Sequence, residues 1–172
     1  VKDVANYLIY SYELKTGTKF ENNELKLQKL IYFAQRESLA LTGEVLFNDR
    51  IEGWKFGPVI PKLRYYIDGM YEPSDTDKLN DTEKYVINNL ISQYGMYSGW
   101  YLRELSHHEK CWKKSRINLN NNEIGNREIT PEDIIEDAKS IRLYDHVYDM
   151  YIDEFEDLNE EEVHLGFSKY SS

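Results

Sequence analysis

Apolar residues recur at helical spacing through most of the chain. In residues 2–15, Val4, Leu8 and Tyr12 lie four apart, which predicts a helix that Gly17 ends. A second helix is expected over residues 23–41, with a C-terminal stop at Thr42 and Gly43. Its buried stripe is predicted to consist of Leu27, Leu30, Ile31, Ala34 and Leu41. The N-terminal part of the chain is therefore expected to be two packed helices.

The pattern changes from helical to alternating after the second helix. Residues 51–56 predict a short strand or extended segment, because two sets of side chains alternate there. The sets are Ile51, Gly53 and Lys55, and Glu52, Trp54 and Phe56. Gly57 and Pro58 mark a rigid turn, so a small antiparallel β element is expected near residues 45–57. Pro61 then predicts the start of a third helix that ends at about Met70.

Helical signals dominate again after a polar loop at 71–80. Helices are predicted at 81–94 and 98–106, with a further helical turn at 109–115. An Asn-rich exposed loop follows at 118–126, and Thr130 with Pro131 begins a last helix. We expect that helix to reach about Leu158, with a break near Ser140 as the alternative. The fold class is mainly α (α+β): one helical bundle of about six to seven helices, with residues 1–172 forming a single domain.

Negative charge concentrates near the C-terminus. Residues 145–162 hold nine Asp and Glu and no Lys or Arg, and the rest of the chain has 22 acids against 21 bases. On a helix, four carboxylates would form one row with a spacing of about 6 Å: Asp145, Asp149, Asp153 and Asp157. This acidic C-terminal helix is expected to be a solvated face, a surface for a basic partner, or, third, a site for a divalent cation.

Composition excludes several classes of protein. The net charge of −10 supplies no overall basic footprint, so direct nucleic-acid binding is not expected. Apolar stretches are too short to span a bilayer and no secretion signal is visible, so no membrane contact and a cytoplasmic location are expected. The fifteen tyrosines suit half-buried and interface positions. Cys111 is the single cysteine, which excludes an internal disulfide.

One short segment concentrates potential metal ligands: His107, His108, Glu109 and Cys111. Zinc sites usually join two separated pairs, and the chain supplies no second pair. We expect one histidine to pack at a helix junction beside Trp112 instead. No cofactor, metal or catalytic residue is predicted, and the protein is not expected to be an enzyme.

The apolar segment Trp54 to Val59 admits two interpretations. It is either a core hairpin locked by Gly57 and Pro58 or an aromatic docking surface. In the second interpretation, the partner-binding candidates on this part of the chain are Trp54, Phe56, Tyr65 and Tyr66. The acidic candidates are Asp145, Asp149, Asp153 and Asp157.

Three segments together resemble the SocA-like Panacea domain family. The first is KLQKLIYFAQ at 26–35 and the second is IEGWKFGPVIP at 51–61, preceded by Leu46 and Phe47. The third is the Leu105-Ser106-His107 block with Glu109 and Trp112. The resemblance covers about residues 1–140, and the acidic end has no counterpart in it.

Membership in that family would imply an antitoxin of a bacterial or phage toxin–antitoxin system. The expected function is a phage-associated, antitoxin-like binding module that neutralises a cognate toxin by direct contact. One alternative is a phage counter-defence protein that uses the acidic face to block a nucleic-acid-binding partner. Another is a proteolytic adaptor that delivers a toxin to a protease. The resemblance supplies no catalytic residues.

Overall fold

The computed structural model describes residues 1–21, 23–68 and 78–155. Its helices are α1 (Lys2–Thr16), α2 (Glu24–Thr42), the 3-10 turn η1 (Pro61–Leu63), α3 (Asp81–Tyr94), α4 (Gly99–His107), α5 (Lys110–Ser115) and α6 (Pro131–Ala138). Its strands are β1 (Ile51–Trp54), β2 (Gly57–Val59), β3 (Glu128–Ile129), β4 (Tyr144–Asp145) and β5 (Met150–Tyr151). The predicted mainly α class with a small β element is confirmed.

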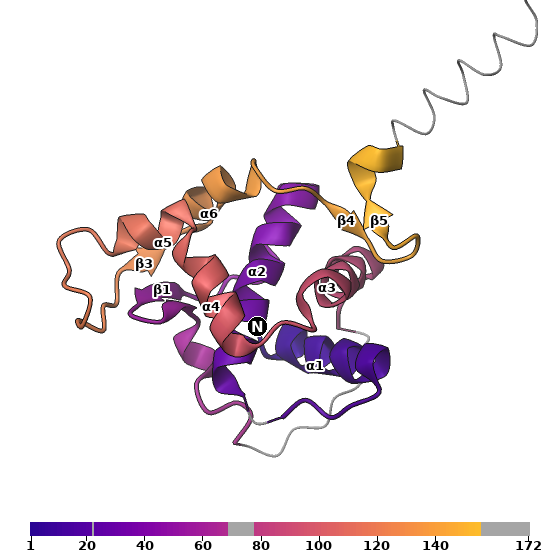
Figure 1. Ribbon diagram of the computed structural model, residues 1–172, viewed down its shortest axis with the longest axis horizontal. Helices are drawn as coiled ribbons and strands as arrows, with labels where there is room; N and C mark the ends of the chain where they lie inside the picture. The colour runs from indigo at the N-terminus through magenta and orange to yellow at the C-terminus, as the bar shows by residue number, and fades with distance from the viewer. Residues whose placement is uncertain (22, 69–77, 156–172) are drawn as a thin grey trace, which may run out of the picture.

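Helix α2 is the centre of the molecule. It contacts α1, α3, α4, α6 and strand β2, and the four helices lie around it in Figure 1. All thirteen residues from Leu27 to Leu39 are buried. The predicted apolar stripe is therefore only part of the buried surface, because polar side chains on the other faces of the helix are enclosed as well. A helix buried on all sides must satisfy those polar groups inside the protein.

The buried polar side chains of α2 hold the neighbouring chain in place. The Gln28 amide donates to the Ile60 carbonyl at 3.2 Å and accepts from the Ile60 N–H at 2.8 Å. The Gln35 amide accepts from the N–H groups of Leu46 and Phe47 and donates to the Phe47 carbonyl. These side chains replace the backbone partners that segments 46–47 and 60 lack, and so fix both segments against the helix.

A three-stranded antiparallel sheet lies beside α2 in the order β2-β1-β3. Lys55 and Phe56 form the turn between β1 and β2, and Trp54 pairs with Gly57. Gly57 has φ of 103°, and a Cβ there would lie 2.5 Å from the Ser106 hydroxyl oxygen and 2.8 Å from Lys29 Cε. A glycine is therefore required both by the backbone conformation and by the close approach of α2 and α4.

Most predicted helix boundaries are confirmed within a residue or two. Gly17 and Gly43 end α1 and α2 in the left-handed conformation. Ser98 caps α4, and Thr130 caps α6 through a capping box with Asp133. The N-cap of α3 is Asn80 rather than Asp81. In the part of the chain that the structure describes, no helix is both long and apolar enough to cross a membrane.

The predicted third helix at 61–70 is wrong. Only Pro61–Leu63 is helical, as a 3-10 turn, and Arg64 leaves the helical region with ψ of 135°. Tyr65 then has φ of 61°, which a right-handed helix cannot accommodate. Residues 69–70 and most of the loop predicted at 71–80 lie outside the described residues.

The long C-terminal helix is also wrong. Helix α6 ends at Ala138, and the chain then forms a hairpin in which Tyr144 pairs with Tyr151. The hairpin lies beside α3, away from β1 (Figure 1). A helical turn begins at Ile152 and is described to residue 155. The predicted row of four carboxylates on one helix therefore does not form, and Asp157 lies outside the described residues.

Candidate functional site

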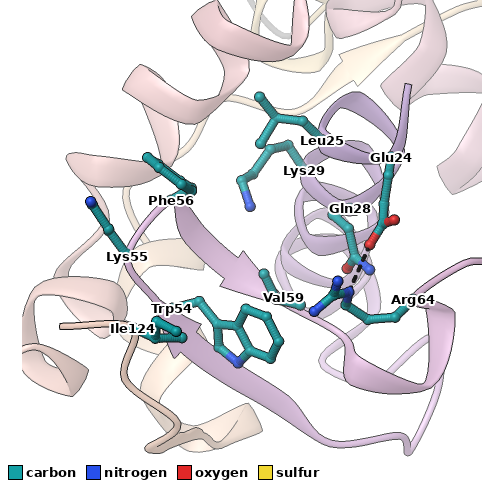
Figure 2. Close-up of a pocket in the computed structure, with 10 residues that line it drawn as sticks. All are labelled: Glu24, Leu25, Gln28, Lys29, Trp54, Lys55, Phe56, Val59, Arg64 and Ile124. Atoms are coloured by element: carbon teal, nitrogen blue, oxygen red, sulfur yellow. Dashed lines mark ion pairs between the residues drawn. The ribbon is translucent and has the colours of Figure 1, made fainter. Parts of the chain in front are cut away.

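A pocket of about 370 Å³ opens between the start of α2 and the β1–β2 hairpin. Figure 2 shows Trp54 and Phe56 on the hairpin side and Glu24, Leu25 and Gln28 on the helix side. The remaining lining residues are Lys29, Lys55, Val59, Arg64 and Ile124. Two of the predicted partner-binding residues, Trp54 and Phe56, therefore meet in one concave site.

Trp54 forms a wall of this pocket and is half-buried. Its indole N–H donates to the Glu52 carboxylate at 2.8 Å, and the Arg64 guanidinium lies 5.2 Å from the ring centroid. The Trp54 carbonyl accepts from the Trp112 indole N–H at 2.8 Å, which ties β1 to α5. Because its polar groups are satisfied within the protein, the ring is held in place with one side toward the pocket.

Phe56 joins the pocket to a second aromatic group on α4. It is 44% exposed and packs edge-on against Trp100, with ring centroids 6.1 Å apart. The Arg103 guanidinium lies within 5.5 Å of both ring centroids. Tyr97 and Tyr101 form a separate pair, with ring centroids 4.6 Å apart, that lines another hollow together with Tyr94.

We define the aromatic surface as Phe56 and Trp100, which pack together and are both exposed. Only Phe56 was predicted from the sequence. A large aromatic side chain two residues after the predicted N-cap Ser98 is the signal that could have indicated Trp100. Large exposed apolar side chains that lie together are typical of protein-binding surfaces.

Tyr65 and Tyr66 lie apart from this pocket lining. Tyr65 is exposed, and its hydroxyl accepts a hydrogen bond from Arg64 at 3.0 Å. Tyr66 packs against the hydrophobic core. Arg64, rather than either tyrosine, contributes to the pocket wall.

Lys29 is the unusual member of the pocket lining. Its side chain has no exposed area, and its ammonium donates to the Pro58 carbonyl at 2.7 Å. Burial, together with the charge of Arg103, lowers the pKa of Lys29 to about 7. Sequence periodicity places this residue on a polar face of α2, so only the packing of β2 and α4 identifies it as buried.

Most of the site lies in a segment that matches a known protein family. The antitoxin SocA-like, Panacea domain family matches residues 27–113, which is half of the chain. The chain belongs to the Panacea domain family. No curated protein and no solved structure matches it. The Panacea match contains α2 from Leu27 onward, the β1–β2 hairpin, α3 and α4, and so includes Lys29, Trp54, Phe56 and the rest of the aromatic surface.

The His107–Cys111 segment of the Panacea match forms part of the helix junction. His107 stacks on Trp112 with ring centroids 3.9 Å apart, which confirms the expected packing role. Desolvation lowers its pKa to about 4, so the ring is neutral at pH 7.

Glu109 and Cys111 instead meet Asp137 of α6, with their candidate ligand atoms all within 4.8 Å of one another. Glu109 accepts from Arg36 at 2.6 Å and from the Tyr32 hydroxyl at 2.8 Å. Asp137 accepts from the backbone N–H groups of Lys110 and Cys111. Burial raises the pKa of the Cys111 thiol far above its usual range. The carboxylates are therefore committed to holding α2, α5 and α6 together, and the expected absence of a metal stays a prediction.

The described members of the predicted acidic row are used individually in the β4–β5 hairpin and in the helical turn that follows it, outside the Panacea match. Asp145 accepts from the Tyr85 hydroxyl and from the N–H groups of Val147 and Tyr148. Asp149 accepts from the Tyr144 hydroxyl, and Asp153 pairs with Arg142 at 2.8 Å. Each described carboxylate thus has a local partner, so they do not present one continuous face.

Proposed function

We propose that this Panacea-domain protein is an antitoxin that neutralises a cognate toxin by direct contact. The observation that carries the proposal is the pocket between Trp54 and Phe56 together with the adjoining aromatic surface. Most of the pocket lining and all of the aromatic surface lie in the family-matched part of the chain. Aromatic side chains held on a rigid hairpin and a helix supply large contact area at a low entropic cost, which favours binding of a protein.

Binding rather than catalysis fits the polar groups near the site. His107 is stacked and uncharged at neutral pH, and the Cys111 thiol is buried and protonated. The buried carboxylate of Glu109 is committed to Arg36 and Tyr32. A nucleophile or general base would have to leave these contacts before it could act. We therefore propose a protein partner and no enzymatic activity.

The acidic C-terminal region supports the counter-defence alternative less well. That alternative needs a continuous acidic face, whereas Asp145 and Asp149 lie on a hairpin and hydrogen-bond to tyrosines. Asp153 is paired with Arg142. The described part of this region therefore gives a basic partner no ordered row of free carboxylates.

Toxin neutralisation in cells tests the proposal. The partner is a protein that copurifies with this chain and arrests growth when it is expressed alone. Phe56→Ala and Trp100→Ala should each weaken the complex by roughly 30-fold, the effect of a 2 kcal/mol hot spot. Growth rescue should fall accordingly, while the melting temperature should change little because both rings are exposed.

Tyr148→Ala is the matched control, because Tyr148 is an equally exposed aromatic on the β4–β5 hairpin. It should leave both binding and growth rescue intact. If Tyr148→Ala abolishes rescue and the two aromatic-surface variants do not, the toxin contacts the other hairpin and the proposed surface is wrong.

A further inference from the structure

The pocket beside Trp54 is locally cationic on a chain whose net charge is −10. Lys29, Lys55 and Arg64 line it, and Arg103, which is itself paired with Glu104, lies over Phe56 at its edge. Glu24 is the one acid in the lining, and it pairs with Arg64 at 3.1 Å (Figure 2). The charge balance at the pocket is therefore opposite in sign to that of the whole chain, which favours an anionic group on whatever binds there.

Lys29 strengthens this preference because its charge is poorly compensated. Among the described residues, no carboxylate lies within ion-pair distance of its ammonium, which donates one hydrogen bond to the Pro58 carbonyl. The charge of Arg103 on α4 acts on Lys29 and lowers its pKa, and His107 on the same helix is neutral. A buried ammonium is costly unless an anion lies close to it. Lys29 has no exposed area, so a carboxylate bound in the pocket would reduce that cost through the protein interior, where charges interact more strongly than in water.

The walls of the pocket require an apolar group beside the anion. Half of its lining residues are apolar: Leu25, Trp54, Phe56, Val59 and Ile124. A volume of about 370 Å³ accommodates one large side chain and a short polar group next to it. The preferred occupant must therefore carry both features on neighbouring atoms.

We propose that the pocket binds a segment of the partner protein that inserts a large apolar side chain between Trp54 and Phe56 and places a carboxylate beside Lys29. This inference rests on the proposed function, which supplies the partner, a toxin. It adds which chemical groups of that partner enter the pocket. The partner's contact segment is therefore both acidic and apolar.

Two matched small molecules test the chemistry without the toxin. Indole-3-propionate and indole-3-propionamide have the same shape and differ in charge. Each is titrated into the full chain, and binding is followed by the NMR signal of the Trp54 indole N–H. At pH 6 the carboxylate should bind roughly tenfold more tightly than the amide, which is the effect of one partly buried charge contact.

Lys29→Met should remove this preference, because it keeps an unbranched apolar stem and deletes the charge. The matched control is Lys19→Met, which removes a charge from an exposed side chain elsewhere. It should leave the tenfold preference unchanged. Equal binding of the two probes to the unaltered protein, or no effect of either probe on Trp54, would overturn the inference.

A pH series on the unaltered protein gives a second test that needs no variant. The carboxylate preference should decline between pH 6 and pH 9 as Lys29 loses its proton. The other charged or titratable groups around Lys29 are Arg103 and His107 from α4, Lys55 from the hairpin, and Glu24 and Arg64 at the rim. Histidine is the type that normally titrates near this range, and His107 is already neutral because its pKa is lowered to about 4. A preference that is constant across this range would contradict a role for Lys29.

The two proposals fail in different ways. If the toxin binds the Lys29→Met protein as tightly as the unaltered protein and the two probes bind equally, the carboxylate inference is wrong and toxin binding stands. If the probe preference is present but Phe56→Ala leaves toxin binding unchanged, the pocket chemistry is right and the proposed toxin-binding surface is wrong.

Discussion

The molecule has two short hairpins that are held in opposite ways. The β1–β2 hairpin lies against α2, where Gln28 and Lys29 bond to Ile60 and Pro58 from inside the core. The β4–β5 hairpin lies on α3, where Asn89 and Tyr85 contact it from a partly exposed surface. The first is in the family-matched segment and the second is outside it. Buried bonds fix a hairpin strongly because water cannot replace them, whereas water can replace the bonds of the second.

Removing one helix contact from each hairpin should give the largest difference in stability between the two hairpins. Gln28→Leu keeps the approximate volume but leaves the buried N–H and carbonyl of Ile60 without their partner. We expect a loss of about 2–4 kcal/mol in the free energy of unfolding, since each unsatisfied buried group costs about 1–3 kcal/mol. Chemical denaturation measures it.

Asn89→Ala is the counterpart on the second hairpin, where Asn89 accepts from the His146 N–H at 2.9 Å. Its loss should cost less than about 1.5 kcal/mol because the bond is only part-buried. An equal or larger loss for Asn89→Ala would show that both hairpins are integral to the core.

Gly57→Ala tests the close packing of the first hairpin. The added methyl group is strained by the backbone φ of 103° and lies too close to Ser106 and Lys29. We expect the free energy of unfolding to fall by about 1–3 kcal/mol. Gly43→Ala separates the two causes, because Gly43 also has positive φ but no atom lies within 4 Å of its added Cβ. Thermal unfolding should therefore show a larger loss for Gly57→Ala. Equal losses would mean that backbone strain alone explains both.

The pH dependence of stability should report on Lys29. Burial lowers its pKa in the folded protein to about 7, below its ordinary value of 10.5. Between these values the unfolded chain binds more protons than the folded protein, so this group makes stability rise with pH. Above pH 7, Lys29 should raise the free energy of unfolding by up to about 1.4 kcal/mol per pH unit. Lys29→Met should abolish this component, as denaturation at pH 7 and pH 9 would show. If the stability of Lys29→Met rises with pH as steeply as that of the unaltered protein, other groups cause the pH dependence.

The smallest effect is expected at Asp145 in the second hairpin. Partial desolvation raises its pKa, but hydrogen bonds from Tyr85 and from the Tyr148 and Val147 N–H groups outweigh this and lower the pKa overall. Asp145→Asn should cost less than about 1 kcal/mol at pH 7, because the carboxylate is only partly buried and solvent screens its interactions. Hydrogen exchange at the Val147 and Tyr148 amides should quicken, while exchange in β1 should stay constant. Faster exchange in both hairpins would contradict their independence.

Local sequence signals determined most element boundaries. Glycines at 17 and 43, Ser98 and the Thr130–Pro131 pair act within one or two turns of the chain, and the structure places helix ends at all of them. The strand alternation and the rigid Gly57–Pro58 pair likewise indicated the first hairpin. Such signals are readable because the atoms that satisfy each other are close in sequence.

The helical periodicity of the C-terminal region gave a wrong prediction, because the same residue spacing fits both a helix and a hairpin. Tyr144 and Tyr151 are seven residues apart, which places them on one face of a helix and also allows them to pair across a hairpin. The structure has the pair, with ring centroids 5.4 Å apart. Asp145 bonds to the N–H groups of Val147 and Tyr148, and Asp149 has φ of 57°, so local polar contacts compete with the helix. Contact of the hairpin with α3 favours this arrangement.

The candidate site depended on tertiary structure even more strongly. The sequence alone identified Trp54 and Phe56 as possible anchors on a rigid turn. It could not place Trp100 beside Phe56, because the two residues are brought together only by the packing of α4 on β2. Nor could it show that Gln28 and Lys29 are buried, because a polar residue on a helix normally faces water. Their burial follows from α2 being enclosed on every side, a property that arises from the packing of all its neighbours.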